Sequence, residues 1–166
     1  MNHEIRDHRL NRESPTPLRW VLWILLLWLF VIIQASFLSY LPLLGATVEL
    51  TLALILLFGW RQNPVVGGIY GMIGGFLLDA LTGAGLSVLP LVFFAGGVYA
   101  AFTARRLHDH PLNYLIMTVP AHLLLGAWRG LSERSLLYAL AVVLAGLIGS
   151  VIVYIPAAVK YFRRKS

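Results

Sequence analysis

The chain contains no cysteine and little charge, and both shortages narrow what it can do. Without cysteine, disulfides, thiolate nucleophiles and cysteine-ligated metal sites are excluded. Only 12% of the 166 residues are charged, whereas soluble domains carry about twice that share. Hydrophobic residues make up 59% of the chain, and the mean hydropathy is +0.80. This composition indicates an integral membrane protein, and the length allows one domain.

The hydrophobic residues fall into six runs that predict six transmembrane helices. We expect these helices near residues 20–41, 47–61, 64–81, 86–103, 112–128 and 135–161. A helix needs about 20 residues to cross the hydrocarbon core, so full crossing by the second and third runs stays open. The predicted fold class is an all-α membrane protein, a compact six-helix bundle.

Basic residues predict how this bundle lies in the membrane. The net charge is +6, and Lys and Arg cluster where the hydrophobic runs end, beside the headgroups. With the N-terminus inside, only Arg129 and Arg134 of the 13 Lys and Arg residues fall outside. The positive-inside rule therefore predicts six crossings with both termini cytoplasmic, and it explains the basic balance without nucleic acid. The domains expected are a cytoplasmic tail at 1–19, the helical domain at 20–162 and a basic cytoplasmic end at 163–166.

The third predicted helix carries small residues at a regular spacing. Gly67, Gly71 and Gly75 recur every four residues, and Asp79 occupies the next step. This spacing places them on one slowly winding stripe, where glycine lets another helix backbone approach closely. Packing inside the chain is the expected use of the stripe, and a partner interface is the alternative. Similar stripes occur at Gly96, Ala100 and Ala104, and at Ala141, Ala145 and Gly149.

Two carboxylates lie at helix ends on the side predicted to face outward. Asp79 ends the third helix, where an ionised side chain needs water, loop amides or a cation beside it. It either caps its own turn or faces a partner. Glu49 follows Thr47, a predicted N-cap, so capping is the expected role of Glu49. An ion pair between one of these carboxylates and one of the outer arginines, Arg129 or Arg134, is the alternative, and the sequence does not choose the partners.

The remaining polar residues carry weaker signals. Part of a metal site is suggested by three adjacent residues, His108, Asp109 and His110. We expect these side chains to be solvated in a loop, because no second cluster of metal-binding residues lies nearby in the sequence. Gln34 and His122 lie within helices, where such side chains usually hydrogen-bond a neighbouring helix. The sequence shows no nucleophile–base pattern, phosphate loop or HExxH motif. We therefore expect a protein that is not an enzyme and has no cofactor.

Segment 48–102 resembles the rod shape-determining protein MreD family. Glu49-Leu50 stands where that family usually has Asp-Leu, Asp79 matches the aspartate ending its glycine-rich helix, and Thr82–Leu86 matches the following turn. Outside this segment the agreement is in hydropathy, chain length and the basic tail.

The resemblance implies a non-catalytic subunit of the cell-elongation machinery in the bacterial inner (plasma) membrane. Such a subunit would bind MreC and, through it, connect to RodA, the transpeptidase partner of RodA and MreB, controlling sidewall peptidoglycan synthesis and rod shape. The resemblance also implies the six-helix fold of the substrate-binding (S) subunits of energy-coupling-factor transporters.

Two other functions stay open. A vitamin-binding S subunit is the first alternative, although its outer loops should carry polar ligand-binding side chains, and the loops here are short. A small intramembrane enzyme is the second, and it would need several ionisable groups at one depth.

Overall fold

The computed structural model describes residues 16–40, 46–83, 88–107, 111–133 and 135–163, and these residues form helices and no strands. In chain order the elements are α2 (Pro17–Ser36), the 3-10 turn η1 (Leu38–Tyr40), α3 (Leu50–Arg61), α4 (Pro64–Thr82), α5 (Leu89–Arg106), α6 (Pro111–Glu133) and α7 (Leu136–Arg163). Three segments are long and apolar enough to cross a membrane, namely α2, α4 and Leu136–Pro156 of α7. The prediction of an all-helical protein with membrane-spanning helices is confirmed to that extent.

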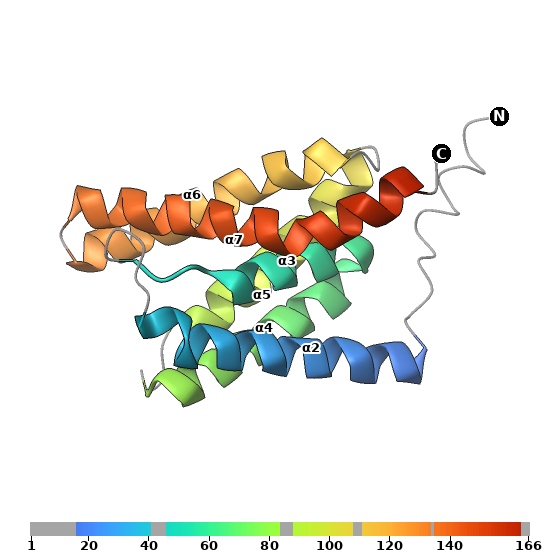
Figure 1. The fold of residues 1–166 in the computed structure, drawn as a ribbon, viewed down its shortest axis with the longest axis horizontal. Coiled ribbons are helices and arrows are strands. Elements are labelled where there is room, and N and C mark those ends of the chain that lie inside the picture. Colours follow the sequence, from blue (N-terminus) through green and yellow to red (C-terminus); the bar gives the residue numbers. More distant parts are fainter. Residues whose placement is uncertain (1–15, 41–45, 84–87, 108–110, 134, 164–166) are drawn as a thin grey trace.

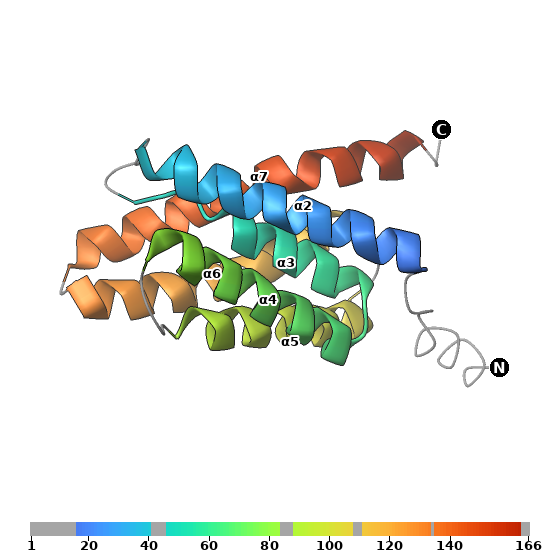
Figure 2. The ribbon, with the colours of Figure 1, turned by 90° about the horizontal axis from the view of Figure 1, so that it is seen from below.

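The helices lie along one common direction and form a bundle (Figure 1). Successive helices from α2 to α7 run in opposite directions, so the start of α2 and the ends of α3 and α5 meet at one end (Figures 1 and 2). That end carries Arg19, Arg61, Arg105 and Arg106, whereas Arg129 lies in the last turns of α6 toward the other end. The bundle therefore separates most of its described basic residues from Arg129.

Helix α3 is the centre of the bundle. Every residue from Leu50 to Trp60 is buried, and α3 contacts α2, α4, α5, α6 and α7. Its 12 residues extend about 18 Å, well short of a hydrocarbon core of about 30 Å. The non-helical stretch Ala46–Glu49 leads into it, and Ala46, Val48 and Glu49 are buried. Non-helical backbone is tolerated at membrane depth where protein surrounds it, as it does here.

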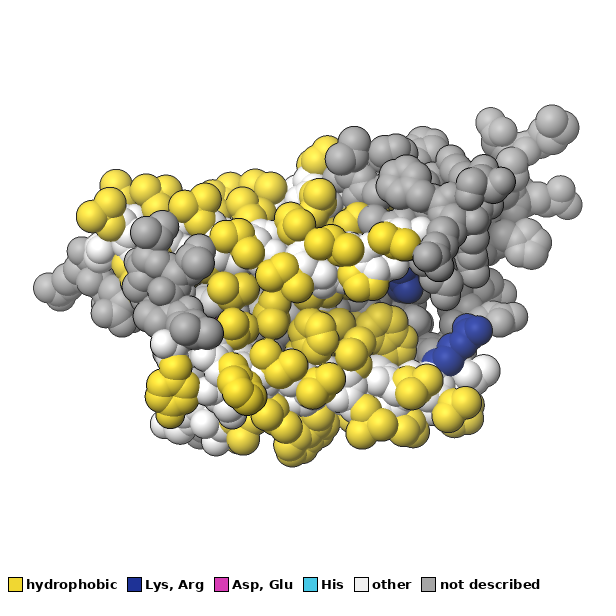
Figure 3. Space-filling view, viewed as in Figure 1, with side chains coloured by type: hydrophobic (Ala, Val, Ile, Leu, Met, Phe, Trp, Pro, Cys, Tyr) yellow, Lys and Arg dark blue, Asp and Glu magenta, His cyan; other side chains and the backbone are white. Residues whose placement is uncertain are grey.

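The outer surface of the bundle is apolar. Large hydrophobic side chains on the outward faces of α2, α4, α6 and α7 are exposed, for example Leu25, Ile69, Leu124 and Leu137. Figure 3 shows hydrophobic side chains over most of the described part of one face, with Lys and Arg at one end. Contiguous apolar surface of this kind is unusual on a soluble monomer and is typical of a lipid-facing surface.

Several helix boundaries differ from those expected from hydropathy. Helix α2 ends at Ser36 rather than near 41, α3 begins at Leu50 rather than near Thr47, and α5 begins at Leu89 rather than near 86. The predicted end of the fifth helix near 128 is wrong, because α6 continues to Glu133. Hydropathy marks where apolar side chains stop, but a helix continues wherever its backbone hydrogen bonds do.

An aromatic cluster joins the first three helices near the arginine-rich end. The ring of Phe58 stacks on Tyr70 at a centroid distance of 3.9 Å, and Trp23 meets Phe58 edge-on at 5.0 Å. The Tyr70 hydroxyl donates to the Trp23 carbonyl oxygen at 2.7 Å. This bond satisfies a buried hydroxyl and ties α4 to α2.

Candidate functional site

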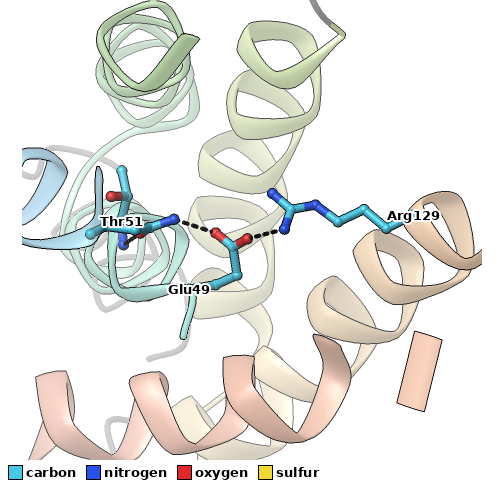
Figure 4. Close-up of polar contacts among 4 residues, drawn as sticks. Glu49, Thr51 and Arg129 are labelled. Atoms are coloured by element: carbon cyan, nitrogen blue, oxygen red, sulfur yellow. Dashed lines mark hydrogen bonds and ion pairs between the residues drawn. The ribbon is translucent and has the colours of Figure 1, made fainter. Parts of the chain in front are cut away.

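A buried ion pair between Glu49 and Arg129 is the centre of the most polar part of the described interior. Glu49 is fully buried, and the Arg129 side chain keeps 19% of its surface exposed. The guanidinium reaches from α6 to the start of α3, where Nη1 lies 2.7 Å from Glu49 Oε1 (Figure 4). The contact is an ion pair without an aligned N–H···O hydrogen bond. The expectation that Glu49 caps its own helix is wrong, since its side chain makes no cap bond.

Gln34 of α2 completes this site and replaces the missing cap. Its Nε2 donates to Glu49 Oε2 at 2.8 Å, and its Oε1 accepts from the Thr51 backbone N–H at 2.8 Å. The first N–H groups of a helix have no partner within that helix, so a side chain must supply one in a dry interior. Gln34 does so from another helix, as expected of a polar side chain within the membrane.

These contacts connect three helices through one carboxylate. Glu49 sits at the positive end of the α3 dipole, accepts from Gln34 and faces a guanidinium, so each carboxylate oxygen has a stabilising neighbour. Removing one member of a buried pair typically costs about 3–5 kcal/mol, because the other charge stays buried alone. The arrangement therefore holds α2, α3 and α6 in one relative position. We call Gln34, Glu49 and Arg129 the polar triad.

Two further buried polar sites are the Thr51 hydroxyl, beside the triad, and the pair His122 and Ser150, between α6 and α7. The Thr51 hydroxyl is fully buried and has no hydrogen-bond partner. His122 of α6 and Ser150 of α7 share a hydrogen bond of 2.8 Å, which agrees with the expectation of a bond to a neighbouring helix. The His122 ring packs on Gly146, where a Cβ atom would collide with the Nδ1 side of the ring. The bond between His122 and Ser150 therefore ties α6 to α7.

The glycine stripe of α4 faces α5 inside the chain. A Cβ at Gly71 would collide with the carbonyl oxygen of Phe93, and one at Gly75 with the backbone of Pro90. A Cβ at Gly67 would lie 2.8 Å from the Gly97 carbonyl oxygen. The two helix backbones are therefore in direct contact, and larger side chains would push them apart. The residue of α5 at this crossing is Gly97. The predicted stripe on this helix contains its neighbour Gly96 instead.

The other small-residue stripes face the centre of the bundle. Ala100 and Ala104 of α5 are buried, as are Ala141, Ala145 and Gly149 of α7. A Cβ at Gly149 would lie 3.1 Å from the Glu49 carbonyl oxygen, so α7 packs directly on the chain entering α3. This close contact contributes to the burial of Val48 and Glu49 in the non-helical stretch.

Asp79 lies in the last full turn of α4 and is 6% exposed. Nearby, Gly83 ends the helix in a left-handed conformation with φ +67°, and the Thr82 hydroxyl donates to the Leu78 carbonyl oxygen at 2.8 Å. The Asp79 side chain is therefore buried. It lies at the C-terminal end of α4, which is at the same end of the bundle as the C-terminal end of α6.

The described residues hold no group of three or more His, Asp or Glu side chains arranged to bind a metal. His108, Asp109 and His110 lie outside the described residues, as do the tail 1–15 and residues 164–166. Comparison with protein-family models, with curated proteins and with solved structures gives no match for this chain.

Proposed function

We propose that this chain is a non-catalytic scaffold in the bacterial inner membrane, a six-crossing bundle that binds a single-pass MreC-like partner in the cell-elongation complex. The observation that carries this proposal is that the polar triad is occupied by contacts within the chain. Its charged and amide groups bind one another across three helices, and glycines bring α4 and α5 into backbone contact. Such a bundle is rigid and apolar outside, which suits a subunit whose function is to hold another membrane protein.

The proposed topology has both termini in the cytoplasm. The alternating directions of the helices and the grouping of Arg19, Arg61, Arg105 and Arg106 at one end support it. The end carrying Arg129 and Asp79 then faces outward. α3 would cross together with the buried stretch before it, since 12 helical residues alone are too short.

The role in cell elongation rests on the resemblance of segment 48–102 to the MreD family. In this proposal the enclosed carboxylate Asp79, near the outward end of α4, orients the surface that meets the partner. The partner connects the scaffold to RodA, its transpeptidase and MreB, so loss of the contact should disturb rod shape.

Co-purification from membranes tests the proposal. Wild-type chain should recover an MreC-like protein, and Asp79→Asn should weaken recovery and rod-shape control while the bundle elutes as a folded species. Glu49→Gln is the matched control, because it makes the same change of carboxylate to amide at a side chain held inside the triad. Failure of the wild-type chain to recover such a partner would contradict the scaffold role. Unchanged recovery with Asp79→Asn would contradict only the role of Asp79.

The S-subunit alternative makes a different prediction. A vitamin-binding subunit should gain thermal stability when its vitamin is added, since a ligand that binds only the folded state stabilises it. A vitamin-dependent shift in the unfolding temperature would favour that function over the scaffold.

A further inference from the structure

A groove opens between α5 and α6 on the side of the bundle. Its volume is about 290 Å³, and Leu52 of the central helix forms part of its lining. Small residues at Ala95 and Gly96 on α5 and at Ala121 on α6 leave this space unfilled. Helices α5 and α6 make few direct contacts, in contrast to the tight pair α4 and α5. The groove therefore opens sideways, toward whatever surrounds the bundle.

In a membrane this groove must be filled by hydrocarbon or by protein. One methylene group is about as large as a water molecule, whose share of liquid volume is about 30 Å³. The space of about 290 Å³ thus holds on the order of ten methylenes, which is much of one acyl chain. A single turn of a helix, about 10 Å wide and 5.4 Å long, occupies roughly 400 Å³. The size of the groove favours an acyl chain over a whole helix.

The Glu49–Arg129 ion pair lies beyond one end of the groove and is not part of its lining. Arg129 lies one helical turn beyond Leu125 on α6, and Glu49 lies one turn before Leu52, and both leucines line the groove. Trp128, also in the lining, is 37% exposed, as expected of an indole at headgroup level. The groove thus leads from an apolar interior to a cation, the order of groups that a phospholipid presents.

Arg129 has capacity left for an anion. A guanidinium carries five N–H donors, and the contact with Glu49 Oε1 is made by Nη1. The side chain keeps 19% of its surface exposed, so further donors can meet a phosphate without breaking the ion pair. Basic residues between transmembrane helices bind lipid headgroups in this way.

We propose that the groove between α5 and α6 is a phospholipid site, with one acyl chain lying against Leu52 and the phosphate bound by Arg129. An acyl chain gains little by leaving other lipid for an apolar groove, because both surroundings are hydrocarbon. The phosphate contact therefore supplies most of the preference for one lipid over another. This proposal does not depend on the scaffold function.

Native mass spectrometry of the full chain in detergent tests the site. Phosphatidylglycerol and a diacylglycerol with the same acyl chains are added in turn, so that the probes differ only in the phosphoglycerol headgroup, which carries the negative charge. A charge-assisted hydrogen bond is stronger than a neutral one, so the wild-type chain should hold one phosphatidylglycerol at least tenfold more tightly than the diacylglycerol.

Matched replacements of alanine by phenylalanine test the groove itself. Ala121→Phe fills the groove, so that a lipid can no longer lie with its phosphate beside Arg129, and it should lower phosphatidylglycerol binding at least tenfold, on the order of the headgroup effect. Ala127→Phe places the same side chain on an exposed position of α6 outside the groove and should leave binding unchanged. If Ala121→Phe elutes as an aggregate, Ala95→Phe fills the groove from the opposite wall, at an exposed position.

Three results would overturn the proposal. The first is equal binding of the two probes by the wild-type chain. The second is equal phosphatidylglycerol binding by folded groove-filling variants and by Ala127→Phe. The third is loss of a co-purifying protein from Ala121→Phe with lipid binding unchanged, which would make the groove a docking site for protein.

Discussion

Replacing Arg129 by methionine should destabilise the bundle strongly at neutral pH. The change removes the cation but keeps a side chain of similar length, and the fully buried Glu49 would keep only Gln34 as a partner. A lone buried charge of this kind costs about 3–5 kcal/mol. For a chain of this length, each kcal/mol lowers the unfolding temperature by roughly 2–4 °C, so the loss is on the order of 10 °C. Tryptophan fluorescence during heating in detergent measures it, since the chain has five tryptophans.

Glu49→Gln supplies the control for this reasoning. It removes the same ion pair but leaves the partly exposed Arg129, which can turn to water or lipid phosphate at lower cost. Glu49→Gln should thus cost less than Arg129→Met, and the double variant should be more stable than Arg129→Met alone. If Glu49→Gln costs as much as Arg129→Met, or if the double variant is no more stable than Arg129→Met, the lone buried carboxylate is not the cause of the loss.

Four further substitutions test the packing and the buried polar contacts, each measured as a change in thermal unfolding. Gly71→Ala should cost about 3 kcal/mol because its Cβ meets the backbone of Phe93, whereas Gly83→Ala, with nothing within 4 Å but φ +67°, should cost about 1 kcal/mol. Gln34→Leu removes one bond to a carboxylate and one to a backbone N–H, and should cost about 3 kcal/mol. Thr51→Val removes an unpaired buried hydroxyl and should be neutral or stabilising by up to about 1 kcal/mol, so a clear loss would show that the hydroxyl has a partner.

Much of the helical arrangement could be predicted from local sequence. Asn63 followed by Pro64 predicts the start of α4, and there the Asn63 side chain accepts from the Val66 N–H at 2.9 Å. The helix ends at Gly83, within the predicted glycine-rich turn. These signals are local, because a cap and a turn depend on residues within one helical turn of each other.

The polar triad could not be derived from local sequence. Glu49 has local features of a cap, yet its partner Arg129 is 80 positions away, and hydropathy placed Arg129 in a loop. Choosing among the outer arginines requires knowing how α3 and α6 lie against each other. The groove was hidden for the same reason, since it arises from small residues on two helices that are not tightly packed.

Labelling of introduced cysteines tests the central claim, that the bundle crosses the membrane with the Arg129 end outside. The chain has no cysteine, so each single variant gives a signal without background. Thr82→Cys and Leu131→Cys should react with a membrane-impermeant maleimide in intact cells, and Gln62→Cys should react only after permeabilisation. Leu124→Cys, exposed on the bundle in the apolar belt, should resist labelling in both conditions. Labelling of Gln62→Cys and Thr82→Cys from the same side would contradict the account, because these positions lie at the opposite ends of α4.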